Sequence, residues 1–254
     1  MSRNFELLNN VMGEELISAV PPPQETTTPV SVPSEAAGQL ASLLQNGPEE
    51  VELTNLVQRV FLRPGAAAPR VVGFAAVESG AGCTWVCAHV GRISAFHLAG
   101  SVCVVDANLR SPSLHREFRV ENEIGLNEAL SQNGPIQDYA RPLCGNKFWI
   151  VGSGSVNAGL DAVTTSERVR SHIASLRNHF DYVLLDLPPL NKYADGVVLG
   201  GVCDGIILVV RANRSRRDTA LRAVSDLKDA NIRLLGVTLN QRTFEIPSAI
   251  YHRL

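Results

Sequence analysis

From residue 70 onward, short apolar runs alternate with longer amphipathic segments. Several runs are almost continuously apolar, which is typical of parallel strands that are covered by helices on both faces. The segments between the runs are long enough for crossover helices. The runs span residues 71–77, 102–105, 148–151, 182–185, 205–210 and 234–239, and the clearest helical segments span residues 84–99, 165–179 and 217–230. This alternation predicts an α/β fold with three layers and a doubly wound, mostly parallel sheet.

The chain has 254 residues, enough for one large domain with a buried core. We expect residues 1–45 to be a flexible N-terminal extension, because five prolines lie between residues 20 and 35. Short helices are expected within it, over residues 1–19 and 36–45. Residues 46–254 are expected to form the α/β domain, which begins with an amphipathic helix over residues 49–62.

Composition excludes several classes of protein. A net charge of -2 gives no general affinity for nucleic acid. The five cysteines are odd in number and form no CxxC pair, which favours a reducing compartment. No apolar run approaches the roughly 20 residues of a membrane-spanning helix, and the N-terminus lacks the apolar core of a signal peptide. We therefore expect a cytoplasmic protein that reaches the inner membrane only through a partner.

A glycine-rich segment, residues 77–84, lies between the first apolar run and a predicted helix. This is the position of a Walker A phosphate loop. Gly80 and Gly82 would let backbone N–H groups converge on an anion at a helix N-terminus. Thr84 lies where the hydroxyl that binds Mg²⁺ is found in such loops. The alternative is a strand-to-helix turn that binds no ligand.

The loop departs from the Walker A pattern at two positions. Val77 replaces the first glycine, and Cys83 replaces the lysine that reaches the β- and γ-phosphates. A charged hydrogen bond contributes roughly 1.5–3 kcal/mol, and its loss costs more in a phosphoryl-transfer transition state. Nucleotide binding through the backbone can therefore persist while catalysis is impaired.

Two apolar runs end in an aspartate, Asp106 and Asp186. In open α/β sheets, ligands bind beyond the carboxyl ends of the strands. A carboxylate there can hold Mg²⁺ or orient a nucleophile, although a single one is often a helix cap. Two such residues together with a glycine-rich loop predict a P-loop NTPase fold with a nucleotide site.

The order of these motifs resembles that of the bacterial tyrosine autokinases of capsule and exopolysaccharide assembly, within the ParA/MinD-like P-loop class. The second motif is Asp106-Ala107-Asn108-Leu109-Arg110 and the third is Asp186-Leu187-Pro188-Pro189. Segments 125–130, 204–211 and 236–240 are also similar to family segments, and the likeness covers roughly residues 50–243.

The resemblance implies that the chain binds ATP or ADP with Mg²⁺. Asp106 would be the catalytic base, Asp186 would support Mg²⁺ or water, and Asn240 would face adenine. The implied metal site is Thr84, Asp106 and Asp186. The implied nucleotide-binding residues are Gly80, Ala81, Gly82, Cys83, Thr84, Trp85, Asn240 and Arg242. The implied partner is a polysaccharide co-polymerase, a chain-length-determinant membrane protein, and a homo-oligomer is also compatible.

Several family features are missing. Asn108 replaces a second aspartate, segment 52–58 lacks the arginines of the E-x-x-R-x-x-R helix, and Tyr251 is the only tyrosine in the C-terminal tail. Three functions follow as hypotheses. The first is a catalytically degenerate regulator of polysaccharide polymerisation and export. The second is an active tyrosine kinase in which Arg110, Arg211 or a partner supplies the missing charge. The third is a ParA/MinD-like positioning ATPase, which the absence of a lysine early in the loop disfavours.

Cys83 also supports a minor hypothesis of a different kind. A helix N-terminus lowers the pKa of a thiol, so Cys83 could be a reactive thiolate with a redox role. No second cluster of ligands accompanies Cys83 and Cys87, so a zinc site is not expected.

Overall fold

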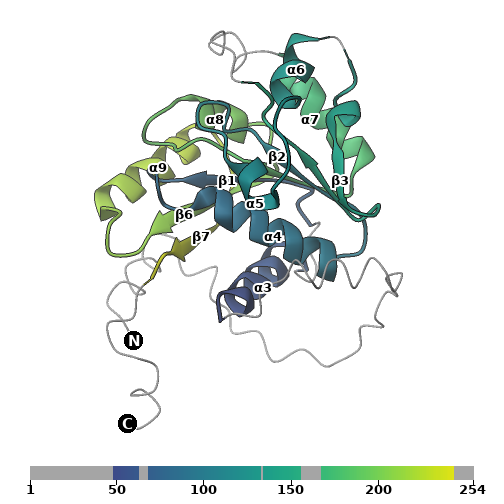
Figure 1. Cartoon of the computed structure of the whole chain (residues 1–254). Coiled ribbons are helices and arrows are strands. Elements are labelled where there is room, and N and C mark those ends of the chain that lie inside the picture. Colours follow the sequence, from purple (N-terminus) through teal and green to yellow (C-terminus); the bar gives the residue numbers. More distant parts are fainter. Residues whose placement is uncertain (1–47, 63–67, 133, 156–166, 243–254) are drawn as a thin grey trace. The chain divides into compact units, whose positions relative to one another are not determined.

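The structure, a computed structural model, describes residues 48–62, 68–132, 134–155 and 167–242. These residues form the α/β domain that the sequence predicts (Figure 1). The N-terminal extension, with the helices predicted over residues 1–19 and 36–45, lies outside the described residues. Tyr251 lies outside them as well.

A seven-stranded sheet forms the centre of the domain, in the order β3-β4-β2-β5-β1-β6-β7. All neighbouring strands in the sheet are parallel except β3 and β4, which are antiparallel. The strands are β1 (Val71–Ala76), β2 (Val102–Asp106), β3 (Arg141–Cys144), β4 (Phe148–Val151), β5 (Tyr182–Asp186), β6 (Gly205–Arg211) and β7 (Leu234–Asn240). The prediction of a doubly wound, mostly parallel sheet is confirmed.

Helices cover both faces of the sheet (Figure 1). They are α3 (Pro48–Phe61), α4 (Cys83–His97), α5 (Leu114–Phe118), α6 (Leu126–Ser131), α7 (Glu167–His179), α8 (Asp195–Gly200) and α9 (Arg217–Asp229), with a 3₁₀ turn, η2 (Ile136–Tyr139). The three predicted crossover helices and the helix over residues 49–62 are confirmed to within two residues at each end. Within the described ranges, no helix has the length and apolar character needed to cross a bilayer.

Every residue of β1 and β2 is buried, because successive side chains point to opposite faces and both faces are covered. Phe74 and Leu184 pack on one face with α3 and α4. Ala75 and Leu185 pack on the other face with α7 and α9. The two cores hold the strands in one register, which fixes where the strand ends meet.

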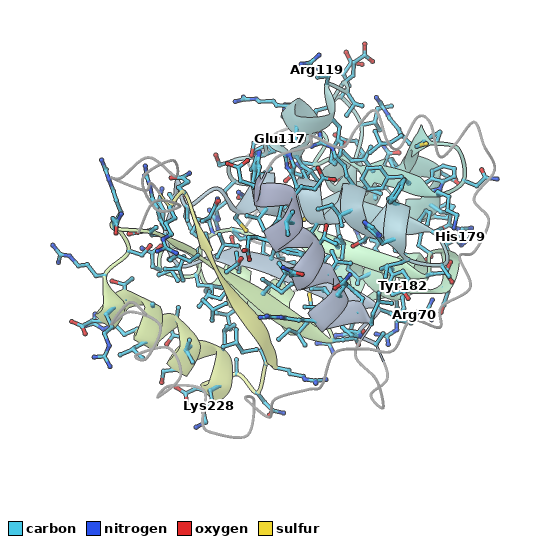
Figure 2. All side chains as sticks on the ribbon, turned by 90° about the horizontal axis from the view of Figure 1, so that it is seen from below. Arg70, Glu117, Arg119, His179, Tyr182 and Lys228 are labelled. Carbon is cyan, nitrogen blue, oxygen red and sulfur yellow. The ribbon has the colours of Figure 1, made fainter. Side chains whose placement is uncertain are left out.

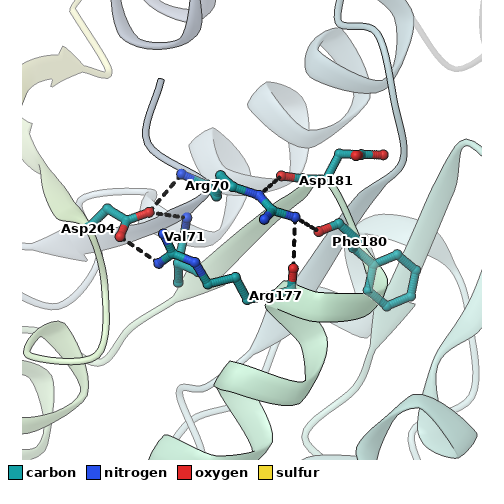
Figure 3. Close-up of polar contacts among 6 residues, drawn as sticks. All are labelled: Arg70, Val71, Arg177, Phe180, Asp181 and Asp204. Atoms are coloured by element: carbon teal, nitrogen blue, oxygen red, sulfur yellow. Dashed lines mark hydrogen bonds and ion pairs between the residues drawn. The ribbon is translucent and has the colours of Figure 1, made fainter. Parts of the chain in front are cut away.

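A polar clasp ties together the N-terminal ends of the central strands (Figure 3). Asp204 accepts hydrogen bonds from the backbone N–H groups of Arg70, at 2.7 Å, and Val71, at 2.9 Å. It also accepts one from Arg177 Nη1 at 2.6 Å. The Arg70 guanidinium donates to three carbonyls around the C-terminal end of α7, those of Arg177, Phe180 and Asp181.

The clasp lies at the end of the sheet opposite the predicted site. Arg70, Tyr182 and His179 lie close together at this end of the domain (Figure 2). The ring of Tyr182 packs edge-on against Phe61 of α3, with ring centroids 5.5 Å apart. The contacts at the N-terminal ends of the strands therefore stabilise the fold, and the predicted site lies at the opposite, carboxyl ends.

Candidate functional site

The loop between β1 and α4 has the backbone shape of a phosphate loop. Gly80 and Gly82 have φ angles of 82° and 80°, in the left-handed region that glycine adopts most readily. A Cβ on Gly82 would lie 2.3 Å from Nδ2 of Asn240, so only glycine fits there. Gly82 is the N-cap residue of the 15-residue helix α4, whose first N–H groups lack partners within the helix. The predicted strand, loop and helix are confirmed, and the geometry suits an anion.

The end of β7 braces this loop. Asn240 Nδ2 donates to the carbonyl oxygen of Ala81 at 2.9 Å and lies 3.5 Å from that of Gly82. Gln241 Nε2 donates to the carbonyl oxygen of Gly80 at 3.3 Å. These bonds tie three backbone carbonyls of the loop to the end of β7. The role predicted for Asn240 opposite adenine stays a prediction, as does that of Arg242, which is exposed just after β7.

Thr84, Asp106 and Asp186 meet at the carboxyl ends of β2 and β5, as predicted. Asp106 and Asp186 are paired in the parallel register and both are fully buried. Thr84 Oγ1 donates to Asp186 Oδ2 at 2.6 Å. Ser113 Oγ in turn donates to Thr84 Oγ1 at 3.0 Å. Asp186 Oδ1 is buried and has no hydrogen-bond partner among the described residues.

Burial raises the pKa of both carboxyl groups. Burial raises the pKa of Asp186 from 3.8 to about 8, and the negative charge of Asp106 adds to this. Burial raises the pKa of Asp106 from 3.8 to about 6, against the lowering effect of the backbone N–H groups that it accepts. No lysine or arginine is among the groups that set either pKa. A cation bound between the strand ends would favour ionisation of both carboxyl groups, because it would offset the negative charge that burial disfavours.

Asp106 has a structural role in this conformation. Its carboxylate accepts the backbone N–H groups of Asn108 at 3.3 Å, Ser113 at 3.1 Å and Leu114 at 3.0 Å. These bonds fix the segment that leads into α5 and complete its N-terminus. A substrate hydroxyl could reach the buried carboxylate only if this segment moved. The role of Asp106 as a catalytic base stays a prediction.

Cys83 is a buried thiol, which contradicts the hypothesis of a reactive thiolate. Burial raises its pKa well above the usual value, and the negative charge of Asp186 raises it further. Burial raises the pKa of Cys87 in the same way. The position of Cys83 at a helix N-terminus suggested a lowered pKa. The carboxylate that opposes this effect, Asp186, is 103 residues away in the chain, so the sequence does not reveal that the two are neighbours. The described ranges contain no group of three or more His, Cys, Asp or Glu residues that could hold a metal ion.

Trp85 packs on the surface of α4. Its ring stacks on that of His89, with centroids 3.9 Å apart and an interplanar angle of 29°. The His89 Nδ1 atom lies 2.8 Å from the Trp85 carbonyl oxygen. The Trp85 ring is therefore packed against a residue of its own helix, and its role in nucleotide binding stays a prediction.

The two arginines proposed to replace the missing lysine lie in different surroundings. Arg110 is in an ion pair with Asp195, at 2.5 Å, and its guanidinium lies 4.6 Å from the ring centroid of Tyr193. Arg211, at the end of β6, extends over the loop, where its Nη1 atom lies 3.9 Å from the position of a Cβ on Gly80.

Three further residues form hydrogen bonds within the site and were not predicted from the sequence: Ser113, Gln241 and Ser215. Ser113 orients Thr84, and Gln241 binds the loop. Ser215 donates to Glu78 Oε1 at 2.7 Å and so ties the loop to the segment after β6. No motif or spacing marks these residues, because each acts through a contact between distant segments.

The fold and this site define a protein of the P-loop NTPase class: a glycine-rich loop on a helix N-terminus beside two aspartates at neighbouring strand ends. Solved structures agree with this fold. The chimerical protein CapA2B2 matches 82% of this chain and 91% of its own, with a TM-score of 0.73 at 20% identity. A cobyrinic acid a,c-diamide synthase from Mycobacterium smegmatis, solved with ADP and magnesium, matches with a TM-score of 0.55 at 19% identity, over 67% of this chain and 73% of its own. At these identities, the likeness shows the fold.

Curated proteins with similar sequences include several bacterial tyrosine kinases. The tyrosine-protein kinase CpsD of Streptococcus agalactiae serotype III (strain NEM316) is 28% identical over 139 residues, 54% of this chain and 60% of that kinase. CpsD of Streptococcus pneumoniae serotype 4 (strain ATCC BAA-334 / TIGR4) is 28% identical over 177 residues, 68% of this chain and 76% of the kinase. No protein-family profile matches the chain.

The chain is similar in sequence to bacterial tyrosine kinases, which agrees with the resemblance that the order of its motifs suggests. It spans about 60% of the length of the first curated relatives that it matches.

Proposed function

We propose that this chain is a nucleotide-binding, catalytically degenerate relative of the bacterial tyrosine kinases that regulates the polymerisation and export of a polysaccharide. One observation carries the proposal. The phosphate loop, Thr84 and Asp186 keep the arrangement of a nucleotide site, while a buried neutral thiol, Cys83, stands in place of the cationic lysine.

The residues present fit a nucleotide diphosphate or triphosphate with Mg²⁺. The unpartnered, buried Asp186 Oδ1 and the Thr84 hydroxyl are hard oxygen ligands of the kind that Mg²⁺ or its bound water prefers. The backbone N–H groups of the loop and of the first turn of α4 would bind the phosphates. When bound, Mg²⁺ neutralises charge on the phosphates. The chain itself supplies the loop that positions them and the carboxylate that holds the cation.

Three features weaken phosphoryl transfer more than binding. Cys83 is uncharged, Asn108 replaces a carboxylate, and the carboxylate of Asp106 is occupied by three backbone N–H groups. Removing one preorganised group that stabilises transition-state charge typically costs on the order of 10²-fold in rate. Losses of this size at several positions would leave a binding protein with little turnover.

A regulator of this kind needs a partner at the membrane. Under this proposal the chain lies in the cytoplasm and docks to a polysaccharide co-polymerase, a chain-length-determinant membrane protein, alone or as a homo-oligomer. The motif resemblance and the capsule-type kinases among its relatives, CpsD and CapB, support this assignment.

ATP turnover and phosphotyrosine formation, measured on the full chain and on Cys83→Lys, test the proposal. We expect the wild type to show no turnover above that of Asp186→Asn, and the lysine to raise it. Cys83→Met is the matched control, because it has a similar length and no charge. Turnover in the wild type that Asp186→Asn abolishes would contradict degeneracy and favour the second candidate, an active kinase. The position of Arg211 beside the loop is the observation that favours this candidate.

A further inference from the structure

Arg211 is placed at the level of the phosphate loop by the sheet itself. Val209 pairs with Ala76, the last residue of β1, so Arg211 lies two residues beyond the point where β1 ends. On its other side Arg211 pairs with Asn240, the residue whose amide braces the loop. Of the two strands beside β6, β1 continues into the loop and β7 ends in the residue that is hydrogen-bonded to it.

The backbone around Arg211 is fixed to the loop through a short relay. The Arg211 N–H donates to Ser215 Oγ at 3.0 Å, and this hydroxyl donates to Glu78 Oε1 at 2.7 Å. The N–H of the next residue, Ala212, donates to the carbonyl oxygen of Asn240 at 2.8 Å. These bonds hold the base of the arginine side chain in a defined position relative to Gly80.

The guanidinium lies against the loop without a counter-ion. Its Nη1 atom is 3.9 Å from the position that a Cβ on Gly80 would take, and the residue is half-buried. Among the described residues it has no carboxylate partner, and Glu78, the acidic residue of the loop, is bound by Ser215. Arg110 and Arg177, by contrast, are paired with Asp195 and Asp204.

We propose that Arg211 is the cation that binds the nucleotide polyphosphate in place of the missing loop lysine. The inference rests on the proposed nucleotide site and names the residue that supplies its positive charge. A guanidinium presents several N–H donors in a plane and binds phosphate oxygens in pairs, which an uncharged thiol at position 83 cannot do. Because it approaches from β6, across Gly80, the arginine binds the phosphates from outside the loop.

The neighbouring basic residues differ from Arg211 in their exposure to solvent. Arg214, Arg216 and Arg217 follow in the β6–α9 connection and are exposed. Their charges are screened by solvent and add at most a general attraction for anions. Arg214→Ala is therefore a matched control: it removes the same charge, three residues away.

The test is calorimetric titration of the full chain with Mg-ADP. Arg211→Ala should weaken binding by about 10- to 100-fold, the range that the loss of a charged hydrogen bond predicts. Arg214→Ala should leave it within about twofold. Arg211→Gln, which keeps a polar side chain but removes the charge, should behave like Arg211→Ala. Thermal unfolding checks that each variant is folded.

Equal affinity of the wild type and Arg211→Gln would overturn this inference while leaving the nucleotide site intact. Absence of Mg-ADP binding by the wild type would overturn the proposed function, and this inference with it.

A second comparison tests the replacement directly. In the Cys83→Lys background, removal of Arg211 should weaken Mg-ADP binding by a much smaller factor, because the lysine takes over the phosphate contact. An undiminished loss in that background would mean that Arg211 acts elsewhere, and would overturn the inference.

Discussion

The buried carboxyl pair makes the ligand-free protein sensitive to pH in an unusual direction. In the folded state the pKa of Asp186 is about 8, because burial and the charge of Asp106 disfavour ionisation. In the unfolded chain it returns to an ordinary value near 4. Between these two pKa values, Asp186 is protonated in the folded state and ionised in the unfolded state.

The sign follows from linkage. Where the folded state binds more protons than the unfolded state, the free energy of unfolding falls as pH rises. Each pH unit in the interval corresponds to about 1.4 kcal/mol for a fully protonated folded carboxyl group. Between pH 5 and pH 8 we therefore expect the ligand-free wild type to lose about 2–4 kcal/mol of stability through Asp186. Asp106, with a pKa of about 6, contributes in the same direction at lower pH.

Asp186→Asn removes the contribution of Asp186 to this dependence, since an amide does not titrate. The assay is urea unfolding at pH 5, 6, 7 and 8 with Mg²⁺ and nucleotide absent. The wild type should lose stability steeply with rising pH, and Asp186→Asn should give a much flatter curve. His89, whose pKa is lowered by burial, titrates with the opposite sign and is common to both proteins. Asp226→Asn, at an exposed position on α9, is the control. Parallel curves for the wild type and Asp186→Asn would show that Asp186 does not cause the pH dependence.

Three further predictions concern the clasp, the loop and the core. Asp204→Ala removes the acceptor of three hydrogen bonds and should lower the free energy of unfolding by about 2–4 kcal/mol in urea titrations, whereas exposed Asp229→Ala should change it little. Gly82→Ala should abolish Mg-ADP binding in calorimetry, because its Cβ would meet Asn240 and the left-handed backbone disfavours it. Leu184→Ala, in the fully buried core, should cost about 2–5 kcal/mol by thermal unfolding.

Much of the fold could be predicted because its strands are buried on both faces. Apolar runs such as residues 71–77 and 182–185 are continuous in the sequence, and a local pattern is enough to recognise them. The edge strand β3 was missed. Its sequence begins with Arg141 and Pro142, and it pairs on one side only, so it needs no apolar run. The short helices α5, α6 and α8 were missed for a related reason: five or six residues carry no periodicity.

The position of the site could be predicted from the sequence, but the protonation and hydrogen bonding of its residues could not. The loop and both aspartates lie where the motifs predict, since the parallel register brings the strand ends together. The raised pKa values of Cys83 and Asp186, the capping role of Asp106 and the bracing role of Asn240 all depend on contacts between distant segments. Burial in particular reverses the behaviour that the helix N-terminus suggests for Cys83.

The most direct test of the account is a calorimetric titration of the full chain with Mg-ATP, followed by chromatography of the recovered nucleotide. We expect saturable binding that Asp186→Asn weakens, with the ATP recovered intact. Absence of binding would contradict the nucleotide site, and conversion of ATP to ADP by the wild type but not by Asp186→Asn would contradict its catalytic degeneracy.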